Sequence, residues 1–324
     1  MVSLYPLTFG PIFKERVWGG RSLERLFHKP LPPGQVIGES WEITDRPEGV
    51  SVVANGPLAG MTLRWLMENH AAELLGPAHA ACRSFPLLVK ILDAREKLSL
   101  QVHPPASKAA ALGGEPKTEM WYIVDATPEA DLFVGLKQGV TRAQFEEKIA
   151  SGDVAECFHR HEVKAGDCMF LPSGRVHAIG AGNVIFEIQQ NSDTTYRVFD
   201  WNRVGLDGKP RELHVQQSLE SIDFTDFEPS LASAEDVGRG ALKFRYLVDD
   251  PLFRVSVTQV RRGERFHLRT TGPQILGMIS GRLEVAAGGE TVKLTPGEFT
   301  LLPASLERVS FQATSKTEYL HVQF

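Results

Sequence analysis

The sequence predicts a mainly β protein that consists of two jelly-roll barrels with a few inserted α-helices. Short apolar runs bounded by turn residues make up most of the chain, and few segments have apolar residues at helical spacing. One pattern, a Gly-acid turn followed by four mainly apolar residues and a proline, occurs at 166–172 and again at 297–303. Since 324 residues suffice for two ordinary domains, the repeat favours two barrels.

Residues 1–60 are predicted to form short strands and turns. In the segment 39–44, Glu39 falls on the apolar side of an alternating pattern, together with Trp41 and Ile43. A carboxylate that is buried at this position needs a partner.

A helix and a buried strand follow. Residues 62–75 have apolar side chains at helical spacing behind Thr62, a residue type that caps helix N termini. Residues 85–92 form a continuous apolar run, which predicts a buried strand. Lys90 interrupts this run, and we expect its charge to face a site or a partner.

The next two predicted strands carry polar residues that suit a metal site. Along the strand 98–103, Gln101 and His103 are two positions apart and therefore point to the same face. After a short helix and loop, the strand 117–124 carries Glu119 near its beginning. These three residues are candidate ligands.

The segment 166–177 combines a strand, a turn and a fourth candidate ligand. Residues 168–171 predict a buried strand, the following Pro-Ser-Gly predicts a turn, and His177 comes just after it. The spacing of these glycines, the proline and the histidine resembles a signature of the cupins, small barrels that hold a metal. With the three candidates above, His177 completes a nitrogen and oxygen donor set that suits Zn²⁺ and leaves room for water or substrate.

The remaining elements of the first barrel follow in order. A helix is predicted over 141–151, and a strand over 183–190 whose Glu187 shares a face with its polar neighbour two residues on. A strand and turn are predicted over 195–203, and a helix over 211–221.

The domain prediction rests on a change of composition. Residues 1–225 are predicted to form the catalytic barrel with its helical insertions, and 226–240 a linker. Residues 241–324 read as strands almost throughout, so we predict a degenerate second barrel. Arg308 stands where the repeat has His177 in the first barrel, so we expect a metal site only in the first barrel.

Composition and charge narrow the class of protein. A formal net charge of −5 provides no basic surface for nucleic acid. The cysteines Cys82, Cys157 and Cys168 form no CxxC pair, which argues against disulfides and thiolate sites and favours a reducing compartment. No signal peptide and no apolar stretch of about 20 residues is present, so we expect a cytoplasmic protein without membrane contact. A monomer or a weak homo-oligomer is expected.

With these segments assembled, the sequence resembles the type I mannose-6-phosphate isomerases of the short bacterial kind. The resemblance begins at the Phe-Lys-Glu-Arg-Val-Trp-Gly-Gly segment at Phe13 and extends to the C-terminal barrel. Two departures from the cupin pattern, a glutamine as first ligand and a distant glutamate, are features of this isomerase family. The resemblance implies one Zn²⁺ per chain, held by Gln101, His103, Glu119 and His177.

The resemblance also implies the activity, the interconversion of mannose 6-phosphate and fructose 6-phosphate through an enediol or enediolate. Lys117 matches the active-site lysine of the family, Glu187 its acidic residue and Arg197 its catalytic arginine. Ser99 and Lys90 match positions associated with the substrate phosphate. The phosphorylated sugar is the one expected partner.

Other interpretations stay open. Glu187 and Arg197 could be ion-pair partners with a structural role only, and the same holds for Ser99 and Lys90. The identity of the catalytic base is not fixed. From other classes, a metal-dependent dioxygenase would favour a His-rich iron site, and a sugar-binding regulator would keep the pocket without needing Glu187 or Arg197.

Overall fold

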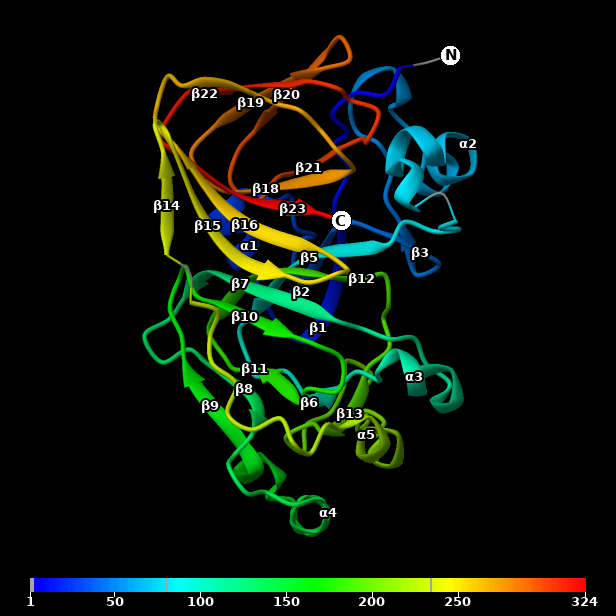
Figure 1. Ribbon diagram of the computed structural model, residues 1–324. Coiled ribbons are helices and arrows are strands. Elements are labelled where there is room, and N and C mark those ends of the chain that lie inside the picture. The colour runs from blue at the N-terminus through cyan, green and yellow to red at the C-terminus, as the bar shows by residue number, and fades with distance from the viewer. Residues whose placement is uncertain (1–2, 80, 234) are drawn as a thin grey trace.

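The computed structural model describes residues 3–79, 81–233 and 235–324, and the protein is mainly β, as predicted. Figure 1 shows two barrels stacked on each other, with green strands in the lower barrel and yellow to red strands in the upper one. All strand pairs between the main elements are antiparallel. Within the described ranges, no helix has the length and apolarity needed to cross a membrane.

The first barrel consists of a six-stranded and a five-stranded sheet. The six-stranded sheet has the order β1 (Ile12–Gly20), β2 (Ile37–Ile43), β5 (Leu87–Ala94), β12 (Asn183–Gln190), β7 (Glu119–Ala126) and β10 (Cys168–Leu171). The five-stranded sheet has the order β13 (Tyr196–Phe199), β6 (Leu100–Val102), β11 (His177–Ile179), β8 (Asp131–Leu136) and β9 (Phe158–Glu162). A short ladder joins β3 (Asp45–Arg46) to β4 (Gly49–Val50). Segments far apart in sequence thus become neighbours in both sheets.

The second barrel repeats this arrangement. Its six-stranded sheet has the order β14 (Asp236–Arg239), β15 (Leu242–Asp249), β16 (Arg254–Val260), β23 (Thr317–Gln323), β18 (Gln274–Ser280) and β21 (Phe299–Leu302). Its four-stranded sheet has the order β17 (Arg265–Leu268), β22 (Val309–Ala313), β19 (Leu283–Ala287) and β20 (Glu290–Leu294). Its interior is filled by apolar side chains such as Leu276, Val285 and Phe311, whereas Arg308 is exposed.

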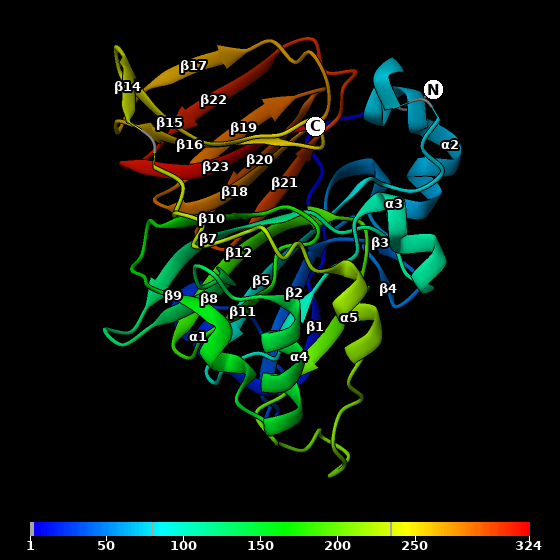
Figure 2. The ribbon, with the colours of Figure 1, turned by 60° about the horizontal axis from the view of Figure 1, so that its bottom comes forward.

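The helices lie outside the sheets, as Figure 2 shows for α2, α4 and α5. They are α1 (Ser22–Phe27), α2 (Leu63–Leu75), α3 (Ala106–Ala109), α4 (Arg142–Ser151) and α5 (Val215–Ser221), with short 3₁₀ turns at Gly56–Leu58, Pro77–His79, Ala110–Leu112 and Val154–Cys157. The predicted cap of α2 is confirmed, because Thr62 accepts a hydrogen bond from the backbone of Trp65. At the start of α4, Thr141 forms a capping box with Gln144.

The predicted helix over 211–221 begins later than expected, at Val215. The residues before it are held in place by β13, because the backbone N–H of His214 donates to Arg197 O over 2.8 Å. Arg211 is tied to Asp200 by a hydrogen bond of 2.7 Å from its Nε. These tertiary contacts keep the segment out of the helix, which the apolar spacing of the sequence does not reveal.

The predicted linker over 226–240 is not a free connection. The backbone N–H of Ala232 donates to Cys168 O over 2.8 Å, so this part of it packs on the first barrel. Its last residues, Asp236–Arg239, form β14 and pair with β15. The linker prediction is wrong for this strand, and the exact division into domains stays a prediction.

One apolar core joins the two barrels. The N-terminal segment crosses to the second barrel, where Leu7 and Leu301 exchange two backbone hydrogen bonds of 2.9 and 2.8 Å. On the outer face of the first barrel, the ring of Phe186 packs edge-on against Phe299, with 5.0 Å between ring centroids. The second barrel therefore covers apolar surface of the first.

The second barrel is predicted to contribute no catalytic group, which His267→Ala tests. His267 lies on β17, is exposed, and has its Nδ1 2.9 Å from Ser310 Oγ. Because this exposed side chain lies on the barrel without a candidate ligand set, we expect kcat for the substrate that the sequence resemblance implies, mannose 6-phosphate, to stay within about twofold. A loss of about 100-fold in a variant with an unchanged circular dichroism spectrum would contradict this prediction.

Candidate active site

A row of four side chains runs across the six-stranded sheet of the first barrel. The strand register places Trp41 beside Lys90, Lys90 beside Glu187, and Glu187 beside Trp121. Residues opposite each other on neighbouring strands share a face of the sheet. Trp121 Nε1 donates to Glu187 Oε1 over 3.0 Å, and Lys90 Nζ lies 3.4 Å from Glu187 Oε2. The register therefore fixes both oxygens of Glu187.

The ammonium group of Lys90 is enclosed by three carboxylates. Its Nζ lies 3.4 Å from Glu187, 3.8 Å from Asp193 and 4.0 Å from Glu39. Burial alone would lower the pKa of Lys90, but Glu187 and Glu39 raise that pKa above its usual value. Lys90 thus carries its charge at neutral pH, and the expectation that it faces a partner is confirmed.

Glu39 also has the partners that its burial requires. It accepts hydrogen bonds of 2.8 Å from Arg16 Nε and 2.7 Å from Trp41 Nε1. Burial alone would raise the pKa of Glu39, but the charges of Lys90 and Arg16 lower that pKa to about 2. The unusual carboxylate on the apolar side of the predicted strand is therefore ionised, and it holds two cations at the edge of the site.

Glu187 combines burial with a mixed charge environment. Its side chain is 4% exposed. Burial raises the pKa of Glu187, Lys117 opposes this shift, and Glu119 adds to it, with a net rise. A carboxyl group whose pKa moves toward neutrality can both accept and return a proton, which general acid–base catalysis requires.

A second row lies on the five-stranded sheet. Neighbouring strands place Arg197 beside Gln101 and Gln101 beside His177. Gln101 Nε2 lies 3.3 Å from His177 Nε2. Arg197 Nε donates to Ser99 Oγ over 3.3 Å, and its Nη1 donates to Glu212 O over 2.8 Å. Within the described ranges Arg197 has no carboxylate partner, and burial lowers its pKa, with Arg211 as a further cause.

Three of the four predicted metal ligands form a buried cluster. The ligand atoms of His103, Glu119 and His177 all lie within 4.8 Å of one another. His103 Nδ1 bonds Thr194 O over 2.8 Å, and His177 Nδ1 bonds Arg175 O over 2.9 Å. Because a carbonyl only accepts, each Nδ1 carries the proton and each Nε2 keeps its lone pair. The Nε2 atoms lie 3.5 and 3.4 Å from the oxygens of Glu119.

This cluster fits a divalent metal ion. His103 Nε2 and both oxygens of Glu119 are buried and have no hydrogen-bond partner within the described ranges. Lys117 Nζ lies 2.7 Å from Glu119 Oε2, but without hydrogen-bonding direction. Burial lowers the pKa of His177 to about 3, and that of His103 is also lowered, so both rings are neutral near pH 7. Buried acceptors without donors are what a bound cation satisfies.

The carboxyl group of Glu119 is ionised despite its complete burial. Burial alone would raise its pKa, but the charge of Lys117 holds that pKa well below the usual value. One carboxylate and two neutral imidazoles therefore converge, and Gln101 approaches His177 from the neighbouring strand. Other groups of three such ligand residues do not occur in the described parts of the chain.

A cavity of about 560 Å³ adjoins this cluster. The predicted site residues Lys90, Ser99, Gln101, Lys117, Glu187 and Arg197 all line it. The metal-ligand candidates His103, Glu119 and His177 do not line it, so only Gln101 of the four faces both the cluster and the cavity. All nine predicted site residues thus gather in one region of the first barrel.

Other residues that line the cavity were not predicted from the sequence, among them Arg16, Asp193, Arg211 and His214. His214 lies on the cavity wall, and its Nδ1 is 3.4 Å from the backbone nitrogen of Arg197. No local pattern marks these residues. Glu39 is the exception, since its place on an apolar strand face was a signal.

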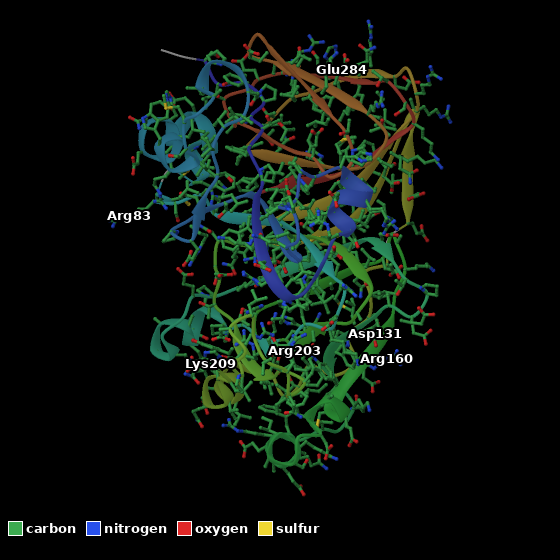
Figure 3. All side chains as sticks on the ribbon, turned by 180° about the vertical axis from the view of Figure 1, so that it is seen from behind. Arg83, Asp131, Arg160, Arg203, Lys209 and Glu284 are labelled. Atoms are coloured by element: carbon green, nitrogen blue, oxygen red, sulfur yellow. The ribbon has the colours of Figure 1, made fainter. Side chains whose placement is uncertain are left out.

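The loop over 200–211 borders the cavity on one side. Gly205 and its next two residues line the cavity, and Asp200 anchors the loop by accepting from Arg203 over 2.9 Å and from Arg211 over 2.7 Å. In Figure 3, Arg203 and Lys209 mark this loop on the lower barrel. Of the charged residues of this loop, Asp207 and Arg211 line the cavity, and Asp200 fixes the position of Arg211.

Fold and site together define a jelly-roll protein with a candidate metal centre beside a charged cavity. A family model described as the catalytic domain of type I phosphomannose isomerase matches residues 7–139. The mannose-6-phosphate isomerase of Streptococcus mutans is 36% identical over 308 residues, which cover 94% of this chain and 95% of that protein. A probable mannose-6-phosphate isomerase of Bacillus subtilis is 35% identical over 320 residues, 98% of this chain and 99% of that protein.

A solved structure agrees with these relatives. The crystal structure of the mannose 6-phosphate isomerase from Bacillus subtilis matches with a TM-score of 0.89 and 30% identity, covering 99% of this chain and 100% of that one. The chain belongs to the type I phosphomannose isomerase family, and the resemblance read from the sequence is confirmed.

Proposed function

We propose that this protein is a zinc-dependent aldose–ketose isomerase that interconverts mannose 6-phosphate and fructose 6-phosphate through an enediol or enediolate. One observation carries the proposal. Among the described residues, the buried ligand atoms of His103 and Glu119 lack hydrogen-bond partners, and they lie beside a cavity lined by Lys117, Glu187 and Arg197. The similarity to proteins named mannose-6-phosphate isomerase supports the choice of substrate.

The donor set suits zinc. Imidazole nitrogen and carboxylate oxygen are common zinc ligands, and a catalytic site keeps a position open for water or substrate. We assign the ligands as Gln101, His103, Glu119 and His177. With one ionised carboxylate, the loaded centre would have a net charge of about +1, and the metal would polarise a carbonyl or hydroxyl oxygen of the sugar.

We assign the proton transfer to Glu187. In the aldose-to-ketose direction, its carboxylate takes the proton from C2 and returns it to C1 while the oxygen at C1 gains and the oxygen at C2 loses a proton. Trp121 donates a hydrogen bond to one oxygen of Glu187, so the base has a fixed direction. Its raised pKa favours the shuttle at neutral pH.

Arg197 and Lys117 supply positive charge to the same cavity. Negative charge develops on the sugar oxygens as the enediolate forms, and fixed cations stabilise this charge more than the neutral ground state. The guanidinium group of Arg197 is held by Ser99 Oγ and Glu212 O and can keep its position without a carboxylate partner.

Metal analysis and an isomerase assay test the proposal. We expect about one zinc per purified chain, and conversion of mannose 6-phosphate that disappears with a chelator and returns with added zinc. A zinc-loaded protein that binds the sugar without converting it would support a sugar-binding regulator instead. Iron-dependent oxygen uptake would support a dioxygenase.

Ser99 and Lys90 are the candidates for contact with the substrate phosphate, since both line the cavity. Lys90→Gln removes the charge and keeps most of the side-chain length. Because the phosphate is ionised throughout the reaction, we expect KM for mannose 6-phosphate to rise at least about tenfold with a smaller change in kcat. Steady-state kinetics measures both constants.

The matched control for this prediction is Lys137→Gln, an exposed lysine of the same barrel outside the cavity. Its kinetic constants should not change. If Lys90→Gln lowers kcat and leaves KM unchanged, the phosphate role is wrong, and Lys90 serves to hold Glu187, 3.4 Å away.

A further inference from the structure

A second cavity, of about 440 Å³, lies between the two barrels. Phe27 and Lys29 contribute from α1 and the loop after it, Glu42 from β2, and Thr291 and Phe299 from the second barrel. Its volume falls within the range of small-molecule sites, and junctions between domains are common places for such sites. No residue of this cavity lines the cavity of the candidate active site.

Strand β2 is the wall between the two cavities. Successive residues of a strand point to opposite faces. Glu39 lines the first cavity and bonds its same-face neighbour Trp41, whereas Glu42 lines the second cavity and bonds its same-face neighbour Ser40. Two carboxylates three residues apart thus serve two separate sites.

The wall of the second cavity contains a buried ion pair. Lys29 is 7% exposed and Glu42 is 4% exposed. Lys29 Nζ lies 2.8 Å from Glu42 Oε1, and Ser40 Oγ donates to the same oxygen over 2.6 Å. Glu42 Oε2 accepts no hydrogen bond from the described residues and is not fully enclosed, so it is an acceptor that a ligand can reach.

Aromatic rings form the apolar part of this cavity. Phe9, Phe27 and Phe299 line it, and Phe186 lies between the last two, with centroid distances of 5.8 Å to Phe27 and 5.0 Å to Phe299. Phe299 is 5% exposed and mainly braces the group, whereas Phe27 is partly exposed and offers a fixed ring face for the C–H side of a ligand. The cavity therefore combines apolar faces with one open carboxylate oxygen.

The charges around the cavity cancel. Lys29 pairs with Glu42, and Lys293 and Glu298 are the other lysine and carboxylate among the lining residues. A balanced set of charges gives no net attraction for a phosphate or another anion. The open oxygen of Glu42 is a hydrogen-bond acceptor, so it favours a neutral ligand with hydroxyl donors.

We propose that this cavity binds a neutral carbohydrate, a sugar ring without phosphate, whose C–H face packs on Phe27 and whose hydroxyl group donates to Glu42 Oε2. The site is separate from the candidate active site, and the proposal does not depend on the isomerase activity. A neutral sugar ring has both features that the walls offer: an apolar face and a rim of donors.

The test uses methyl α-D-mannopyranoside, which is neutral and cannot open to the aldehyde. Binding to the full, zinc-loaded chain is measured by saturation-transfer difference NMR with saturating fructose 6-phosphate present, so that the first cavity is occupied. We expect saturable binding with Kd on the order of 1 mM. No saturation at a hundredfold higher concentration, or displacement by fructose 6-phosphate, would overturn the proposal.

Two variants locate the bound sugar. Glu42→Gln places a donor or a neutral acceptor at the open oxygen, and we expect binding at least about tenfold weaker. Phe27→Leu keeps an apolar side chain but removes the ring face, and should weaken binding about fivefold or more. Phe27 is only partly buried, so we expect Phe27→Leu to fold. The Phe27→Leu variant therefore provides the test in case Glu42→Gln does not fold. Unchanged affinity in a folded variant would overturn the assignment, and Arg197→Ala should leave this binding unaffected.

Discussion

His177→Ala is expected to remove stoichiometric zinc and to lower isomerase activity at least about 10³-fold, because metal polarisation contributes several kcal/mol to such reactions. The ring of His177 is 1% exposed, and its free Nε2 lies 3.4 Å from Glu119. Without this ring the cluster keeps one imidazole and one carboxylate, together with Gln101. Metal content is measured by mass spectrometry after gel filtration, and activity by coupled assay.

The matched control is His159→Ala, which removes a half-buried histidine of the same barrel outside the cluster. It should keep both zinc and activity. Loss of the His177 ring also removes its edge-on contact with Trp121, 5.3 Å between centroids, so folding is checked by circular dichroism. Stoichiometric zinc in a folded His177→Ala protein would show that the ligand assignment is wrong.

The local elements of the site could be predicted because they depend on short-range patterns. The alternation of Gln101 and His103 on one strand requires only the two-residue period of a β-strand. Pro172 and Gly174 predict the turn before His177, because these residue types favour turns. In the structure Gln101 reaches His177, and His103 reaches Glu119, although β6 ends at Val102 and His103 lies just past it.

The way in which these elements come together in space could not be predicted from the sequence. The side-chain rows depend on strand order and register, with β12 inserted between β5 and β7 across about 60 to 95 residues of chain. Asp193, Arg211 and His214 reach the cavity from loops that no periodicity describes. Location in the cell and oligomeric state depend on no feature of the described fold and stay predictions.

The partner of Glu39 illustrates the boundary between the two cases. The strand pattern predicts that a buried carboxylate needs a partner, which follows from the cost of burying an unpaired charge. The strand pattern cannot show which cation pairs with Glu39, because Arg16 and Lys90 come from two different strands on either side of β2. The need for a cationic partner thus follows from the local sequence, whereas the identity of that partner depends on the tertiary structure.

Arg197→Ala is the prediction that separates an isomerase from a sugar-binding protein. If Arg197 stabilises the enediolate, its charge matters more in the transition state than in the bound sugar. We therefore expect kcat for mannose 6-phosphate to fall roughly 10²-fold or more, with a smaller change in KM. The position supports this role: Arg197 lies beside Gln101 in the sheet and lines the cavity.

The control for Arg197→Ala is Arg160→Ala, an exposed arginine on β9 that is paired with Asp131, as Figure 3 shows. Removing it takes the same charge from the same barrel but from outside the cavity, so kcat and KM should both stay unchanged. If Arg197→Ala raises only KM, the guanidinium group binds the sugar equally in ground and transition states, and it is a substrate clamp. Stabilisation of the developing charge would then fall to Lys117, whose Nζ is 2.7 Å from Glu119.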